Sequence, residues 1–222
     1  MAARMVQVSG LEVQEFASRS GFVLTDDVAR HLAGYLELLM QWNRVMNLVG
    51  TRSWQETFSA LVVDSLHLGR FLEKEGIVAD TTWDLGAGAG LPGLPLRMIW
   101  TQGTFWMVEA REKRAIFLST VLARFPLPQT HVFRGRAEQF MAGPPPRRAD
   151  LVMSRAFMPW ADVLALVRDN LTPQGAVLLL LRECHLSELE NEAQARHWTL
   201  KAAADYKVGQ TRRTLCALAP MP

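Results

Sequence analysis

Apolar residues recur at every third or fourth position in the first third of the chain, which is the spacing of one face of an α-helix. The clearest run follows Thr25, which can cap a helix, and ends near Asn47. A second run begins at Ser53 and Glu56, which have the spacing of a capping box, and ends around Gly76. No residues with catalytic spacing stand in these helices, so we expect them to form a cap on the remainder of the chain.

Beyond residue 78, short apolar runs alternate with segments of helical period. The runs predict strands at residues 82–85, 105–108, 131–133, 151–153 and 176–181. Strands that alternate with helices form parallel sheets, because their crossover connections are right-handed. Two last runs, 198–207 and 214–218, are separated by a turn and predict an antiparallel hairpin at one edge of the sheet.

This order of elements predicts an α/β fold with a Rossmann-like, doubly wound, seven-stranded sheet, a terminal antiparallel hairpin and an N-terminal helical cap. We divide the chain into a helical segment, residues 1–78, and a cofactor-binding domain, residues 79–222. The proline-rich residues 143–146 are interpreted as a surface loop before the fourth strand, not as a domain boundary.

Composition is typical of a globular protein, since 49% of the 222 residues are hydrophobic and 21% are charged. The longest apolar run, residues 176–181, is far below the roughly 20 residues that span a membrane. The two cysteines allow no disulfide framework, and the five histidines lack the spacing of metal ligands. We therefore expect a cytoplasmic protein with neither a membrane nor a metal partner.

The formal net charge of +2 conceals an uneven distribution along the chain. Residues 1–80 hold 7 basic and 10 acidic side chains, whereas residues 111–155 hold nine basic and three acidic ones. Such a positive field favours polyanions, nucleic acid first, and a solvated basic face is the alternative. Arg147 and Arg148, beside the proline-rich loop, are candidates to contact RNA phosphates.

A predicted strand that ends at Asp84 runs directly into a loop with Gly86, Gly88 and Gly90. Ligands of open α/β sheets bind beyond the carboxyl ends of the strands, and this is the first such end. The dinucleotide fingerprint fails because Leu91 stands where its third glycine belongs, and the lysine of a P-loop is missing too. We expect the three glycines to leave no room for side chains, so that backbone passes against a compact, phosphate-free ligand.

Acidic residues recur where the predicted strands end. Asp84 ends the first strand, Glu109 ends the second, and Glu138 follows the third. A carboxylate at this rim can accept two hydrogen bonds from the cis-diol of a ribose, and an acidic pocket suits a positive sulfonium group. Each acid alone is more often a helix cap, so only the three together indicate an adenosyl ligand such as S-adenosylmethionine.

Several motifs resemble those of the ribosomal RNA small subunit methyltransferase G family. They are residues 84–93, 109–114, 135–138 and 154–156, with shorter matches at 42–43, 47–48 and 64–66. The resemblance implies a class I methyltransferase that uses S-adenosylmethionine to methylate N7 of one guanine in the decoding-region loop of 16S ribosomal RNA. It further implies that the partner is 16S ribosomal RNA or the small ribosomal subunit, and we expect a monomer.

By this resemblance Gly86 and Leu91 line the methionine and adenosine side of the cofactor. Ala137 and Glu138 hold its adenine, and Glu109 matches the acidic residue of the family after the second strand. The full set predicted to bind the cofactor is Asp84, Gly86, Gly88, Gly90, Leu91, Glu109, Ala137, Glu138 and Arg155.

Two arginines carry the predicted catalytic roles. The resemblance places Arg155 at the junction of cofactor and target base, and it matches Arg213 to an arginine of the terminal hairpin, with the adjacent Arg212 as the alternative. Departures from the family pattern occur at Leu61, at Val49 and Gly50, and at Arg182 and Glu183. They bear on contacts with RNA rather than on cofactor binding.

Guanine N7 carries an exposed lone pair, so its methylation needs in-line placement but neither a general base nor a covalent intermediate. Methylation of a pyrimidine at C5 would instead need a cysteine nucleophile, for which only Cys184 lies near a strand end. Trp160 could stack on a flipped base, with a core position as the alternative. Methylation of another RNA or a small molecule, and RNA binding without catalysis, are the other functions consistent with these residues.

Overall fold

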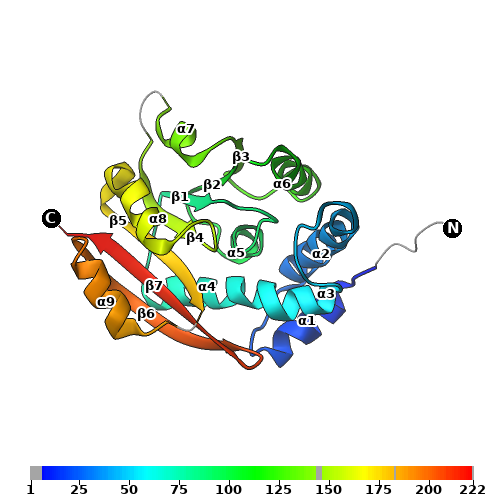
Figure 1. Cartoon of the computed structure of the whole chain (residues 1–222). Coiled ribbons are helices and arrows are strands. Elements are labelled where there is room, and N and C mark those ends of the chain that lie inside the picture. The colour runs from blue at the N-terminus through cyan, green and yellow to red at the C-terminus, as the bar shows by residue number, and fades with distance from the viewer. Residues whose placement is uncertain (1–6, 144–146, 183, 222) are drawn as a thin grey trace.

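A seven-stranded sheet forms the centre of the molecule (Figure 1) in the computed structural model, which describes residues 7–143, 147–182 and 184–221. Residues 144–146 of the predicted proline-rich loop, and Glu183, lie outside this range. The strands are β1 (Thr81–Leu85), β2 (Thr104–Glu109), β3 (Thr130–Arg134), β4 (Ala149–Ser154), β5 (Leu171–Arg182), β6 (Trp198–Val208) and β7 (Thr211–Pro220).

The strand order is β3-β2-β1-β4-β5-β7-β6. Strands β1 to β5 are parallel, and β7 pairs antiparallel with both β5 and β6. The order reverses direction beside β1, between its neighbours β2 and β4, which is where doubly wound sheets bind their ligands. The predicted sheet and its terminal hairpin are therefore confirmed.

Helices cover both faces of the sheet. They are α1 (Gly10–Arg19), α2 (Asp26–Met46), α3 (Trp54–Thr57), the π-helix η1 (Phe58–Val62), α4 (Val63–Lys74), α5 (Gly93–Ile99), α6 (Glu112–Arg124), α7 (Ala137–Met141), α8 (Trp160–Val167), the 3-10 helix η2 (Arg168–Asn170) and α9 (Leu186–Gln194). Among the described residues no helix is both long and apolar enough to cross a membrane.

The alternation of side chains along the strands supplies one core to each face. Leu151 and Met153 of β4 belong to the core beneath the N-terminal helices, α5 and α6, whereas Val152 between them belongs to the core beneath α7, α8 and α9. This period of two is the reason that both layers of helices can pack on the same strands.

The N-terminal helices begin and end where the capping residues predict. The Thr25 side chain accepts a hydrogen bond from the N–H of Val28 at the start of α2, and Asn47 ends that helix with a φ of 48°. The Ser53 side chain likewise accepts from Glu56 N at the start of α3. The long helix predicted from here is continuous but contains the π-helical turn η1 before α4.

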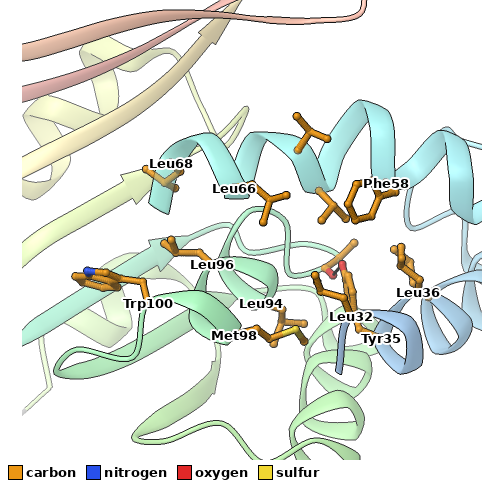
Figure 2. Close-up of a cluster of buried hydrophobic side chains, with 14 of the residues drawn as sticks. Leu32, Tyr35, Leu36, Phe58, Leu66, Leu68, Leu94, Leu96, Met98 and Trp100 are labelled. Atoms are coloured by element: carbon orange, nitrogen blue, oxygen red, sulfur yellow. Dashed lines mark hydrogen bonds between the residues drawn. The ribbon is translucent and has the colours of Figure 1, made fainter. Parts of the chain in front are cut away.

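Helix α4 packs against α5, the helix that follows the glycine loop. Figure 2 shows Leu66 of α4 facing Leu96 of α5, and Leu94 of α5 and Leu36 of α2 belong to the same buried cluster. All four side chains are fully buried. Because the burial of each leucine contributes about 1.5–3 kcal/mol, this contact fixes the helical cap beside the loop that begins the candidate site.

Candidate active site

The glycine loop connects β1 to α5 with a left-handed backbone at each of the three predicted glycines. Gly86, Gly88 and Gly90 have φ values of 71°, 60° and 79°. A Cβ at Gly86 would lie 2.5 Å from the ring of Phe157, and one at Gly90 would lie 2.3 Å from Leu94 Cδ1. At Gly88 an added Cβ would lie 3.7 Å from Arg114 Nη1 and from Gly86 O, which is ordinary van der Waals contact, so the prediction that no side chain fits is wrong at this position.

Glu109 holds the glycine loop through its carboxylate. Its Oε2 accepts a hydrogen bond of 2.8 Å from Gly88 N, and its Oε1 accepts one of 2.8 Å from Arg111 N. Each carboxylate oxygen has a second lone pair, so Glu109 retains acceptor capacity for a ligand. In this fold Glu109 therefore fixes the backbone of the glycine loop at Gly88.

Asp84 lies at the end of β1 with almost no exposure to solvent, and its Oδ2 has no hydrogen-bond partner among the described residues. Burial raises the pKa of Asp84 to about 7, while the nearby charge of Arg155 opposes this rise and that of Glu109 adds to it. The Gly93 backbone also lowers the pKa of Asp84, and Oδ2 lies so close to Gly93 that a Cβ there would be 2.3 Å from it.

A cavity of about 400 Å³ opens at the carboxyl ends of β1, β2 and β3. Of the residues predicted to bind the cofactor it brings together Gly86, Glu109, Ala137 and Glu138. The rest of its lining is Val108, Ala110, Arg111, Arg114, Gly135, Arg136, Ala156, Phe157 and Met158. Asp84, Gly88, Gly90, Leu91 and Arg155 are not in this lining, although Gly88 contacts it through the hydrogen bond to Glu109.

A second cavity, of about 450 Å³, lies at the carboxyl ends of β4 and β5 and reaches the hairpin. Its walls include both predicted catalytic arginines, Arg155 and Arg213, together with Trp160. Ala156 and Met158 line this cavity and the first one alike. The two cavities are therefore neighbours separated by the loop after β4.

A buried polar cluster closes the second cavity on one side. The carboxylate of Asp64 accepts from the Tyr206 hydroxyl at 2.9 Å and from Arg213 Nη1, and Arg155 Nη2 lies 3.2 Å from its Oδ2. Arg213 Nε has no hydrogen-bond partner among the described residues. Arg212 instead approaches Asp205 to 3.7 Å with an exposed side chain, so Arg213 is the hairpin arginine that reaches the cavity.

The sequence did not single out Asp64 or Tyr206 as site residues. The short family-like motif at 64–66 was the available signal for Asp64. For Tyr206 the signal is its position opposite Arg213 in the hairpin, a pairing that only the register of β6 and β7 reveals.

The remaining candidates occupy structural positions. Cys184 is half-buried, and burial raises the pKa of its thiol, so it stays protonated near neutral pH. The Asn43 side chain accepts from Val49 N at 2.8 Å and donates to Thr51 O, which fixes the turn after α2. No cluster of three or more metal-ligating side chains occurs within the described part of the chain.

Comparison with known proteins shows to which family the chain belongs. A model of the family described as rRNA small subunit methyltransferase G matches residues 28–216. The chain belongs to this family.

Relatives named ribosomal RNA small subunit methyltransferase G are similar over most of their length. The protein of Nitratidesulfovibrio vulgaris is 57% identical over 81% of this chain and 82% of its own. That of Lawsonia intracellularis is 42% identical over 93% and 94%. The predicted family is thus confirmed.

Solved structures show the same class I methyltransferase fold at low identity. A methyltransferase from Pyrococcus furiosus has a TM-score of 0.53 at 15% identity and covers 73% of this chain and 86% of its own. Precorrin-6y C5,15-methyltransferase from Geobacter metallireducens has a TM-score of 0.53 at 12% identity and covers 69% and 87%. This likeness confirms the predicted fold class of the chain.

Proposed function

We propose that this protein transfers a methyl group from S-adenosylmethionine to N7 of a guanine in 16S ribosomal RNA. The observation that carries the proposal is the pair of adjoining cavities that share Ala156 and Met158. One cavity suits an adenosyl cofactor, the other a base, and a shared wall gives the short separation that methyl transfer needs.

The first cavity fits the cofactor by its chemistry. Glu109 keeps free lone pairs for a ribose diol. Ala137, Glu138 and Gly86 line the same cavity, and we expect the first two to meet the adenine edge. The carboxylates of Glu109 and Glu138 in this lining suit a cationic cofactor. When bound, S-adenosylmethionine supplies an electrophilic methyl group.

The second cavity suits an acceptor-rich base. Arg155 and Arg213 present guanidinium donors to it, and Trp160 offers an aromatic face on which a flipped base can stack. Among the described residues that line it, Asp64 is the one carboxylate, and both of its oxygens are engaged by Tyr206, Arg213 and Arg155. Guanine N7 needs no base, so this arrangement is sufficient for that reaction.

The proposal is tested by incubating the protein and labelled S-adenosylmethionine with small ribosomal subunits in one reaction and with 16S RNA alone in another. We expect 7-methylguanosine on nucleoside mass analysis, and the two substrates together show which form is used. A methylated cytosine, or turnover of the cofactor on a small molecule without RNA, would contradict it. We expect the active protein to be a cytoplasmic monomer. Light scattering during turnover measures its mass and so checks that it is a monomer.

Two variants separate N7 methylation from C5 methylation of a pyrimidine. Arg155→Ala should lose about 100-fold in rate, because a misplacement of reactants by about 1 Å costs that much. Cys184→Ser should keep most activity, since its protonated thiol forms no covalent intermediate in N7 methylation. Single-turnover rates of both variants on the same RNA give the comparison, and an inactive Cys184→Ser enzyme would support the pyrimidine reaction.

A further inference from the structure

The Asp64 cluster joins three elements that are far apart in the sequence. Asp64 lies on α4, Arg155 follows β4, and Tyr206 and Arg213 face each other across the hairpin of β6 and β7. The Asp64 and Arg213 side chains meet over a separation of 149 residues. The Asp64 carboxylate is therefore one polar contact of the helical cap with the carboxyl edge of the sheet, and the hydrogen bond from the Tyr35 hydroxyl to Ala89 O in the glycine loop is another.

The charges of this cluster do not balance. The buried carboxylate of Asp64 pairs with the buried guanidinium of Arg213 and the partly buried guanidinium of Arg155, and the exposed Arg182 adds a third positive charge to the walls of the same cavity. Buried charges are costly to desolvate, and replacing such groups by well-packed apolar residues is often neutral or stabilising. Stability alone is thus a weak reason for this cluster to exist.

Unused donors in the cluster indicate what it is arranged for. Arg213 is buried and lines the cavity, yet its Nε has no acceptor among the described residues. A buried donor without a partner costs about 1–3 kcal/mol. An acceptor oxygen of a ligand in the cavity would offset the excess positive charge, and a small shift of the Arg213 side chain would let it accept from Nε as well.

Tyr206 holds the carboxylate from the opposite side. Burial and the neighbouring Asp64 both raise the pKa of the Tyr206 hydroxyl, so the hydroxyl stays protonated and donates. The Tyr206 ring stacks against His67 of α4, with ring centroids 4.3 Å apart and planes at 31°. The ring position and hence the hydroxyl direction are fixed by that contact.

We infer that Asp64 and Tyr206 are positioning residues, which orient the guanidinium groups of Arg155 and Arg213 toward acceptor oxygens of the target nucleotide. The inference rests on the proposed function, because the second cavity must receive the base. Guanine O6 and a flanking phosphate offer the same acceptor chemistry, and guanine is preferred over adenine because adenine carries a donor at the position of O6.

Asp64→Asn removes the charge while keeping the shape, and Tyr206→Phe removes only the hydroxyl. We expect Asp64→Asn to lower kcat/KM for RNA about 100-fold and Tyr206→Phe about 10-fold, with the affinity for S-adenosylmethionine within about twofold of the parent value. Loss chiefly in KM would indicate a phosphate contact, and loss chiefly in kcat would indicate contact with the reacting base. Either pattern supports positioning.

Asp205→Asn is the matched control. Asp205 stands one residue from Tyr206 on β6, accepts from Thr214 and approaches Arg212, and it does not line the cavity. It should leave kcat/KM within about twofold of the parent value. Asp64→Asn protein that is folded, binds the cofactor and methylates RNA at the parent rate would overturn the inference.

Arginine side-chain NMR supplies a readout that does not depend on turnover. In the parent protein we expect a slowly exchanging Nε–H signal for Arg213. Asp64→Asn should shift and broaden this signal, whereas Asp205→Asn should leave it unchanged. Should Asp64→Asn fail to fold, Tyr206→Phe gives the decisive comparison. If the parent protein methylates no guanine, the proposed function fails, whereas the NMR comparison still reports whether Asp64 orients the arginine.

Discussion

At the scale of single residues, Gly88 is the glycine of the loop at which an added Cβ would not clash with another atom. Substitution to Asp requires a left-handed backbone at φ 60°, which costs about 1–2 kcal/mol, but meets no protein atom closer than 3.7 Å at Cβ. We expect a folded Gly88→Asp protein that loses at least 10-fold in affinity for S-adenosylmethionine, because a new carboxylate stands beside Glu109. Isothermal titration measures this loss.

Gly21→Asp is the control for that experiment. Gly21 also has a positive φ, 78°, with no atom within 4 Å of an added Cβ, and it follows α1 away from the two cavities. It should bear the same backbone cost and keep the parent affinity. Equal affinity in both variants would show that the cofactor does not approach Gly88.

Asp84 gives a prediction about pH. The carboxyl has a pKa of about 7 in the fold against an ordinary value of 3.8, so between these values the folded state retains a proton that the unfolded state has lost. The contribution of Asp84 to the free energy of unfolding therefore falls as pH rises from about 4 to 7, by about 4 kcal/mol in total, and is constant above that range.

Urea unfolding of the parent protein and of Asp84→Asn at pH 5, 6, 7 and 8 checks this dependence. The difference in unfolding free energy between the two should shift in favour of the variant as pH increases. A difference that is independent of pH would mean that Asp84 is ionised throughout.

At the scale of elements, α4 both packs the cap and carries Asp64. Leu66→Ala removes a fully buried side chain that faces α5, and we expect a loss of about 2–5 kcal/mol in unfolding free energy. Val78→Ala, at an exposed site beyond α4, should change it by less than about 0.5 kcal/mol. Chemical denaturation of both variants gives the values.

Most elements were predictable because their patterns are local. Thr25, Ser53 and Glu56 mark helix starts by side-chain chemistry that needs no distant partner. Helix α7 was not predicted, since its five residues, Ala137–Met141, are too short to show a period. Strand β5 begins at Leu171, whereas the sequence predicted a start at residue 176. The prediction missed the first residues of the strand because they include proline and glycine, which disfavour strands.

The candidate site was predictable only where it is contiguous in sequence. The glycine loop and Glu109 follow strands directly, so topology alone places them at one rim. The Asp64 cluster depends on contacts over 142 and 149 residues, and no local pattern encodes those. The roles of Arg155 and Arg213 and the division at residue 78 remain predictions.

At the scale of the whole molecule, the basic excess in residues 111–155 is only partly available to RNA. Arg147 lies over the rings of Trp106 and Phe140 at 4.8 and 4.6 Å, and Arg148 donates to Leu171 O at 2.9 Å. These contacts give both arginines a structural use that the sequence did not reveal.

The double variant Arg147→Gln, Arg148→Gln tests whether these arginines also contact RNA. If each neutralises a phosphate, the slope of log K against log salt should flatten by about 1–2, and the affinity should fall alike for all sequences. A slope equal to that of the parent protein, measured by filter binding across a salt series, would restrict the two residues to structural contacts.

The loop after β4 has a consequence for how two ligands influence each other. Ala156, held at a φ of 51°, and Met158 face both cavities, so a shift of this loop on filling one cavity changes the shape of the other. Bound RNA then changes the dissociation constant of the cofactor, and bound cofactor changes the dissociation constant of RNA. Thermodynamic linkage requires that the two factors be equal. A non-reactive cofactor such as S-adenosylhomocysteine allows both constants to be measured, and Ala156→Gly, which relaxes the backbone, should bring that common factor closer to one.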